Sequence, residues 1–135
     1  IAIAASLSHA CGIVADSTAY CWGQNTTGVL GDSSTVARAT PGPVYGGHRF
    51  TRISTNQSQS CGVVANGDIY CWGAGAGGQL GYGGTTSQTI PTRVASTGIT
   101  FVDVSTVIGA SCGLASTGQA YCWGINQFGN LGDGT

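Results

Sequence analysis

Hydrophobic and polar residues alternate in short runs along the chain, and no stretch shows the 3.6-residue period of a helix. Residues 50–54, 60–64 and 68–72 each predict a short strand. A further extended piece at 90–94 contains Pro91, which restricts it to a sheet edge or a strand start. The pattern predicts an all-β chain built from small antiparallel sheets of three or four strands.

This pattern occurs three times. The stretch from Cys11 to Gly23 returns as Cys61 to Gly73 and as Cys112 to Gly124, so the period is 50 and then 51 residues. Such a period is typical of propeller blades and solenoid units. We expect repeat units at residues 1–49, 50–100 and 101–135. Because one small sheet cannot bury both of its faces, neighbouring units must stack on each other.

Two cysteines frame a predicted hairpin in each repeat. Gly67 and Gly118 occupy one turn position, where a short hairpin needs a positive φ, but the first copy has Ser17 there. An antiparallel register around this turn sets the paired cysteines opposite each other, with Cα atoms about 4.5–5.5 Å apart, a distance that a disulfide can bridge. We therefore expect three disulfides: Cys11–Cys21, Cys61–Cys71 and Cys112–Cys122.

The competing interpretation of six cysteines is metal binding. Structural zinc sites usually take ligands from closely spaced C-x2-C pairs, and the chain has none. Disulfides are therefore favoured, and neither a metal site nor a cofactor is expected. Regularly paired cysteines place the protein in an oxidising compartment, which means secreted, periplasmic or at the cell surface.

Charge is scarce in this chain. Only 7% of residues are charged, Lys and Glu are absent, and the net charge is −1. This composition offers no basic surface for nucleic acid or anionic lipid, and no apolar run is long enough for membrane insertion. Asn25-Thr26-Thr27 and Asn56-Gln57-Ser58 match the N-glycosylation acceptor pattern.

The segments Trp22–Asp32 and Trp123–Thr135 resemble the regulator of chromosome condensation repeat, whose consensus carries Trp-Gly, Asn and Gly-Gln-Leu-Gly in this order. The middle copy has Gly75 in place of the Asn but keeps the complete Gly78–Gly81 motif. The resemblance implies a β-propeller, usually of seven blades. The predicted disulfide in each repeat makes secreted bacterial members of the family a nearer comparison than nuclear ones.

The family's His before the first hairpin strand corresponds to His9, which Gln59 and Ala110 replace in the other copies. We interpret His9 as a packing and hydrogen-bonding residue. One large aromatic residue per repeat is expected to fill the gap between adjacent sheets, in preference to forming a ligand-stacking row. These residues are Trp22, Trp72 and Trp123.

Fewer than three full periods cannot close a propeller ring. We expect a partial propeller that belongs to a longer one, and favour this over a propeller completed by association of copies. The two histidines and five aspartates occupy unrelated repeat positions, so no acid/base pair is indicated and an enzyme is not expected.

The favoured function is a secreted or surface-exposed protein-interaction module, with a protein partner that the sequence does not identify. Its contacts are expected where the repeats differ, because surface aromatic residues and Arg are the usual interface anchors. The candidates are Tyr45, His48, Arg49 and Tyr82. The alternative is a structural building block of an extracellular assembly or filament, in which low charge and unpaired sheet edges promote head-to-tail contacts.

Overall fold

The computed structural model describes residues 1–135 and contains eleven strands and no helix. No segment of it therefore forms a helix that could cross a bilayer. The strands are β1 (Ala2–Ala5), β2 (His9–Ile13), β3 (Ala19–Gly23), β4 (Arg38–Pro43), β5 (Phe50–Thr55), β6 (Gln59–Val64), β7 (Ile69–Gly73), β8 (Gln88–Arg93), β9 (Phe101–Val107), β10 (Ala110–Ala115) and β11 (Ala120–Gly124).

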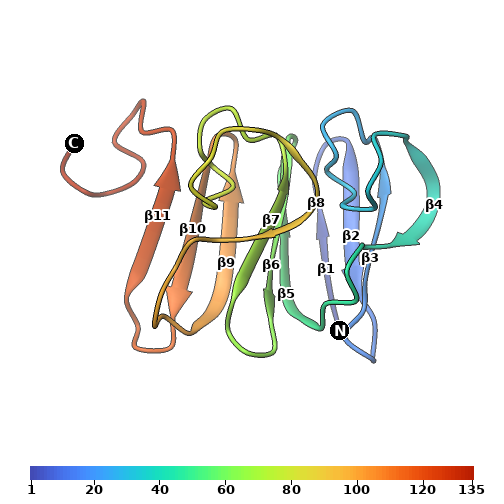
Figure 1. Cartoon of the computed structure of the whole chain (residues 1–135), viewed down its shortest axis with the longest axis horizontal. Helices are drawn as coiled ribbons and strands as arrows, with labels where there is room; N and C mark the ends of the chain where they lie inside the picture. The colour runs from blue at the N-terminus through green and yellow to red at the C-terminus, as the bar shows by residue number, and fades with distance from the viewer.

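These strands form three antiparallel sheets in chain order, which we call blade 1 (β1–β4), blade 2 (β5–β8) and blade 3 (β9–β11). Figure 1 shows the blades side by side, with β1, β5 and β9 as the first strand of each. The all-β architecture of propeller blades is thus confirmed. The proline-containing strands β4 and β8 lie at sheet edges, where the missing N–H of proline does no harm.

The hairpins have the register that the cysteine spacing predicts. Cys11 lies opposite Cys21, and the other two pairs repeat this arrangement. All three disulfides are present, each with Cα atoms 4.1 Å apart. Ser17 adopts the positive φ of the glycines at its position, 67° against 87° for Gly67. The Asp16 carboxylate accepts the N–H of Thr18 at 2.9 Å and supports this turn without a glycine.

The hydrophobic core lies between the blades, in two separate layers. The first layer joins blades 1 and 2 around Ile13, Phe50 and Trp72, and the second joins blades 2 and 3 around Ile69 and Phe101. All residues of β6 are buried because blade 2 is covered on both faces. Blades 1 and 3 are each covered on one face.

Backbone hydrogen bonds fix each blade to the hairpin turn of the one before it. The N–H of Phe50 donates to the Ser17 carbonyl at 2.8 Å, and the N–H of Phe101 donates to the Gly67 carbonyl at 2.8 Å. The equivalent bonds repeat from blade to blade, so they set a constant spacing between sheets.

Candidate functional site

Three of the four candidate contact residues lie together. Tyr45, His48 and Arg49 all belong to the connection between β4 and β5, whereas Tyr82 lies in the loop between β7 and β8. In Figure 1 the first connection descends to the end of the molecule that carries the β2–β3 turn, while the β7–β8 loop rises to the other end.

The β4–β5 connection is tied to the blades by a backbone hydrogen bond and an aromatic contact. The N–H of Tyr45 donates to the Gly31 carbonyl at 2.8 Å, and the His48 ring stacks on Tyr70 with 4.2 Å between centroids. Burial lowers the pKa of His48, so its imidazole is neutral at pH 7. The phenol of Tyr45, in contrast, is 57% exposed. The connection therefore presents one aromatic side chain from a fixed backbone.

Arg49 anchors the end of this connection. Its Nη1 donates to the Asp16 carbonyl oxygen at 2.7 Å and lies 3.7 Å from the Asp16 carboxylate. The hydrogen bonds from Thr18, and then the charge of Arg49, lower the pKa of Asp16. Both side chains are largely exposed, so this ion pair orients Arg49 more than it stabilises the fold.

Tyr82 makes hydrogen bonds within its own loop. Its hydroxyl donates to the Thr86 carbonyl at 2.9 Å and accepts the Thr86 N–H at 2.9 Å. At the same loop position in blade 1, the Asp32 carboxylate accepts the N–H of Ser34 at 3.1 Å. Tyr82 thus stabilises a loop that lacks the family Asn, and we leave it out of the interaction site that we propose below.

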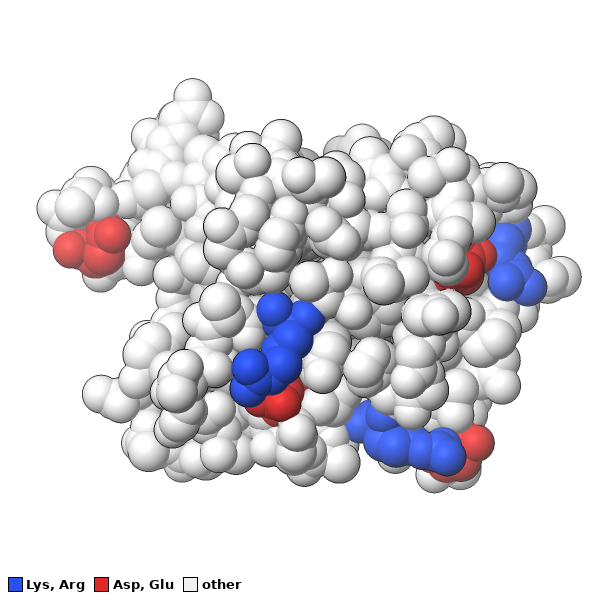
Figure 2. Space-filling view, viewed as in Figure 1, with Lys and Arg blue, Asp and Glu red and all other residues white.

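The few charged groups form no patch. Figure 2 shows isolated positive side chains, each beside a negative one. The three ion pairs are Arg38–Asp32, Arg49–Asp16 and Arg93–Asp68. No three His, Cys or Asp side chains lie close enough together to bind a metal ion.

The three tryptophans occupy different environments. Trp72 is fully buried, its Nε1 donates to the Val29 carbonyl of blade 1 at 2.8 Å, and its ring covers Gly31. Trp123 repeats this contact on blade 2, where Nε1 donates to the Gln79 carbonyl at 2.9 Å. These two residues fill gaps between sheets. Trp22 faces no preceding blade and lines an open groove on the outer face of blade 1.

A buried chain of hydrogen bonds joins blades 1 and 2, and the sequence did not predict it. The Ser60 hydroxyl donates to the Val29 carbonyl at 2.9 Å, so Nε2 of His9, 2.8 Å away, donates to the Ser60 oxygen. Burial lowers the pKa of His9 to about 4, which keeps the ring neutral at pH 7. His9 therefore connects two blades.

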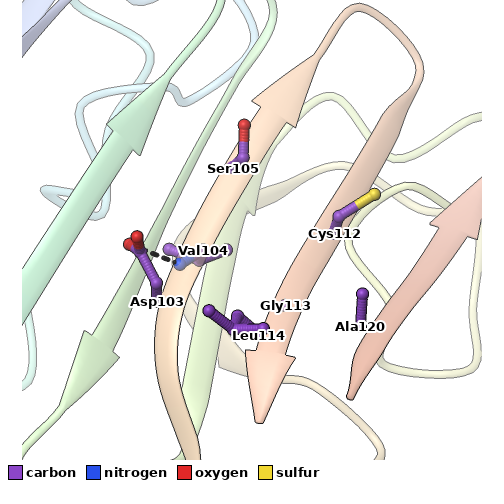
Figure 3. Close-up of a pocket in the computed structure, with 7 residues that line it drawn as sticks. All are labelled: Asp103, Val104, Ser105, Cys112, Gly113, Leu114 and Ala120. Carbon is purple, nitrogen blue, oxygen red and sulfur yellow. Dashed lines mark hydrogen bonds between the residues drawn. The ribbon is translucent and has the colours of Figure 1, made fainter. Parts of the chain in front are cut away.

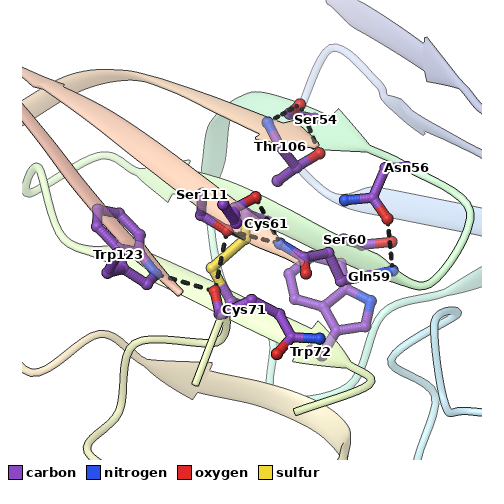
Figure 4. The surroundings of a disulfide bond; sticks show 12 residues. Ser54, Asn56, Gln59, Ser60, Cys61, Cys71, Trp72, Thr106, Ser111 and Trp123 are labelled. Atoms are coloured by element: carbon purple, nitrogen blue, oxygen red, sulfur yellow. Dashed lines mark hydrogen bonds between the residues drawn. A yellow bond between two sulfur atoms is a disulfide. The ribbon is translucent and has the colours of Figure 1, made fainter. Parts of the chain in front are cut away.

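The same chain recurs between blades 2 and 3, as Figure 4 shows around the Cys61–Cys71 disulfide. Gln59 Nε2 donates to the Ser111 hydroxyl at 2.6 Å, and that hydroxyl donates to the Gln79 carbonyl at 2.9 Å. The signal in the sequence is a serine directly before the first cysteine of the second and third repeats. The hydrogen-bond partner of this serine can be identified only when the neighbouring blade is known.

The two asparagines of the glycosylation patterns are both buried. Asn25 donates to the Ser34 carbonyl at 3.0 Å and accepts the N–H of Leu30 at 3.0 Å, so it organises the β3–β4 loop. Asn56 donates to the Val107 carbonyl of blade 3 at 2.9 Å. Neither amide is accessible to a modifying enzyme in the folded chain.

The outer face of blade 3 carries a shallow hollow, shown in Figure 3. Ser105, Cys112, Leu114 and Ala120 contribute to its mainly apolar lining. The Asp103 carboxylate at its rim accepts the N–H of Val104 at 2.9 Å. The hollow lies on the face of blade 3 that no other blade covers.

Solved structures with this architecture come from several organisms. Human WBSCR16 matches at a TM-score of 0.86 with 18% identity over 93% of this chain and 33% of its own. Saccharomyces cerevisiae Prp20p, which binds Gsp1p and histones, matches at 0.82 with 24% identity over 100% of this chain and 34% of its own. The ectodomain of the Physcomitrella patens receptor kinase CR4 matches at 0.63 with 25% identity over 93% of this chain and 29% of its own.

The chain thus spans about a third of the length of these proteins. No protein of curated function matches the sequence. Two family models do, both of the regulator of chromosome condensation (RCC1) repeat, one over residues 66–118 and one over residues 1–28. With three sheets of one design, and with these models covering more than half of the residues, the chain belongs to the RCC1 repeat family of β-propeller blades.

Proposed function

We propose that this chain is part of a secreted or surface-exposed propeller that binds a protein partner through the β4–β5 connection and carries out no catalysis. The three disulfides support a location outside the reducing cytosol. The similar CR4 structure is itself an ectodomain. Prp20p has the same fold as this chain and binds other proteins. Fold alone does not fix function, so the proposal depends on the site.

The observation that carries the proposal is the exposed Tyr45, whose backbone N–H is hydrogen-bonded to the Gly31 carbonyl. A side chain presented in a fixed position loses little conformational freedom when it enters a partner's pocket. Arg49, held by Asp16, adds a second anchor of the type that dominates protein interfaces. His48, between them in the chain, is partly exposed and packs against Tyr70.

The test begins with identification of a partner. The purified chain is exposed to extracellular protein from its source, the retained protein is identified by mass spectrometry, and that protein is purified. Its affinity is then measured for the wild-type chain and for Tyr45→Ala and Arg49→Ala. Loss of an interface anchor should weaken binding by at least about tenfold.

Val36→Ala serves as the control, because Val36 is also strongly exposed but lies in the β3–β4 loop. Its affinity should equal that of the wild type. Unchanged affinity in both the Tyr45 and the Arg49 variant would refute the proposed site. Six free thiols in protein purified without reductant from its natural source would refute the proposed location.

A second function, a building block of an extracellular assembly, is favoured by one specific observation. The outer faces of blades 1 and 3 are both uncovered and apolar.

A further inference from the structure

The two N-glycosylation acceptor patterns are complete in the sequence, but the fold uses both of their asparagines internally. Asn25 is only 1% exposed and Asn56 only 9% exposed. A glycosylated asparagine lies on the surface of a folded protein, because the attached oligosaccharide is bulky and hydrated. The acceptor patterns and the fold therefore make opposite demands on the same two side chains.

Asn25 fills the inside of the β3–β4 loop. Its Nδ2 donates to the carbonyls of Ser34 at 3.0 Å and Val36 at 3.2 Å, and lies 3.2 Å from Oδ1 of Asp32. Its Oδ1 accepts the N–H of Leu30 at 3.0 Å. Because the loop surrounds this nitrogen with acceptors and buries the residue, an oligosaccharide on Nδ2 could not leave the loop without opening it.

The loop that Asn25 holds also carries a contact to blade 2. Leu30 is fully buried, and the carbonyl of Val29 beside it accepts the Ser60 hydroxyl and the Trp72 indole N–H. If the loop were displaced, these two buried donors would lose their acceptor, which is costly in a site closed to water. Modification of Asn25 would thus disturb the contact between blades 1 and 2 as well as the loop.

Asn56 belongs to the contact between blades 2 and 3. Its Nδ2 donates to the Val107 carbonyl of blade 3 at 2.9 Å. Its Oδ1 accepts the N–H groups of Ser58 at 2.8 Å and Gln59 at 3.2 Å, so the side chain is fixed at both ends. An oligosaccharide on Nδ2 would occupy the place of Val107 and hold blade 3 away from blade 2.

Oligosaccharyl transfer acts on this same nitrogen. Nδ2 attacks C1 of a sugar carried on a polyprenyl pyrophosphate, so the N–C1 bond forms and the C1–O bond to the pyrophosphate breaks. Nδ2 loses one proton, and the polyprenyl pyrophosphate leaves with the electron pair of the broken bond. The amide product keeps one N–H in place of two, so the modified side chain also has half of its donor capacity.

Folding would not protect Asn56 where this reaction takes place on the chain during its synthesis. The partner of Asn56 is Val107, which follows 51 residues later. At a synthesis rate of about 5–20 residues per second, Asn56 stays without that partner for roughly 3–10 s. Its acceptor pattern is therefore open to the transferase before the fold can bury it.

We propose that neither asparagine can carry an oligosaccharide in the folded protein, and that the chain reaches its oxidising location by a route without oligosaccharyl transfer, such as bacterial export to the periplasm. The second part depends on the location that we propose above. Tyr45 and Arg49 have no role in it, so the proposed interaction site can fail while this inference holds, and the inference can fail while that site holds.

The test directs the chain, behind a cleavable leader, into the bacterial periplasm and into the endoplasmic reticulum of a eukaryotic cell. Thr27→Val combined with Ser58→Ala removes both acceptor patterns and keeps both asparagines. Thr26→Val combined with Gln57→Ala is the matched control, because it changes two exposed residues and keeps both patterns. Recovery of each protein from the periplasm without free thiols establishes that it folds.

In the endoplasmic reticulum, the wild type and the control should receive an oligosaccharide on Asn25 or Asn56, measured as the mass lost on peptide N-glycosidase treatment. The glycosylated fraction should be at least about tenfold lower in secreted protein than in protein retained in the cell, because retention follows misfolding. Retained molecules should have free thiols. The variant without acceptor patterns should be secreted with three disulfides.

An inhibitor of lipid-linked oligosaccharide assembly provides a second measurement that changes no residue. It should raise secretion of the wild type to that of the variant without acceptor patterns. Secreted, disulfide-bonded wild type with an oligosaccharide on either asparagine would overturn the incompatibility. Wild type that leaves the reticulum unmodified, and as abundantly as that variant, would overturn the inferred route, since it would show that the transferase does not use these patterns.

Discussion

At the scale of single residues, the contacts between blades converge on backbone carbonyls. The Val29 oxygen accepts both the Ser60 hydroxyl and the Trp72 indole, and the Gln79 oxygen accepts the equivalent pair. A carbonyl has two lone pairs, and here both are used by the next blade. Each buried donor is thereby satisfied without a charged group in the interface.

The repeats supply a matched test of this contact. Trp72→Phe removes the donor to Val29 and part of a fully buried ring, and should lower the free energy of unfolding by about 2 kcal/mol. Trp22→Phe changes a partly exposed ring without an acceptor and should cost less than about 0.5 kcal/mol. Urea unfolding of both variants beside the wild type provides the comparison. Equal losses would contradict the assignment.

His9 should make stability depend on pH. Burial lowers its pKa to about 4 from an ordinary 6.5, so the unfolded chain binds more protons than the folded chain between these values. The stabilisation is complete above pH 6.5 and is lost as pH falls towards 4. We expect a loss of about 3 kcal/mol over this range, because one unit of pKa shift corresponds to about 1.4 kcal/mol.

His9→Gln provides the control for this titration, because Gln59 fills the same position in blade 2 and donates to Ser111. The variant should match the wild type at pH 7 and lose less stability between pH 6.5 and 4. Urea unfolding at several pH values measures both. Identical pH profiles for the two proteins would show that another group is responsible.

At the scale of elements, the hairpins could be predicted well from sequence because their determinants are local. Two cysteines ten residues apart and a turn between them fix register, so the disulfides and paired strands were correct. The burial of an element could not be predicted in this way. Trp22 and Trp72 stand in the same motif, yet only Trp72 has a preceding blade to pack on.

The same reasoning explains the candidate site. Differences between repeats singled out the β4–β5 connection, whose role as a contact surface stays a prediction, and they also singled out Tyr82, whose hydroxyl makes hydrogen bonds within its own loop. A difference between repeats shows that a residue makes a different contact. It does not show whether that contact lies within the chain or is made with another molecule. The buried chain from His9 to Ser60 was missed because its two ends lie in different repeats.

The disulfides should differ in their resistance to reduction. Cys11, Cys21, Cys61 and Cys71 are fully buried, whereas Cys112 and Cys122 lie on the uncovered face of blade 3 and are partly exposed. A reductant should therefore cleave Cys112–Cys122 first. Timed alkylation followed by peptide mass spectrometry would give the order. Simultaneous loss of all three bonds would mean that reduction requires global unfolding.

At the scale of the whole molecule, stability should be graded because each blade depends on its neighbours. Blade 2 is covered on both faces, and its β6 strand is entirely buried. Blade 3 is covered on one face, and every residue of β11 is exposed or partly exposed. In a stack held by nearest-neighbour contacts, the terminal unit is the first to open.

Hydrogen exchange would detect this gradient. Amides of β6 and β7 should exchange at least about tenfold more slowly than the paired amides of β10 and β11. Uniform protection across all blades would instead indicate a single cooperative unit.

The acceptors at Val29 and Gln79 have one consequence for the evolution of such repeat proteins. Main-chain oxygen is present whatever amino acid the codon specifies, and the aligned residues are indeed Val29, Gln79 and Asn130. A gene segment encoding one blade can therefore be duplicated or transposed without coordinated change at this point. The acceptor of this contact belongs to the polypeptide backbone, so the side chain of the residue that carries it is free to vary between blades.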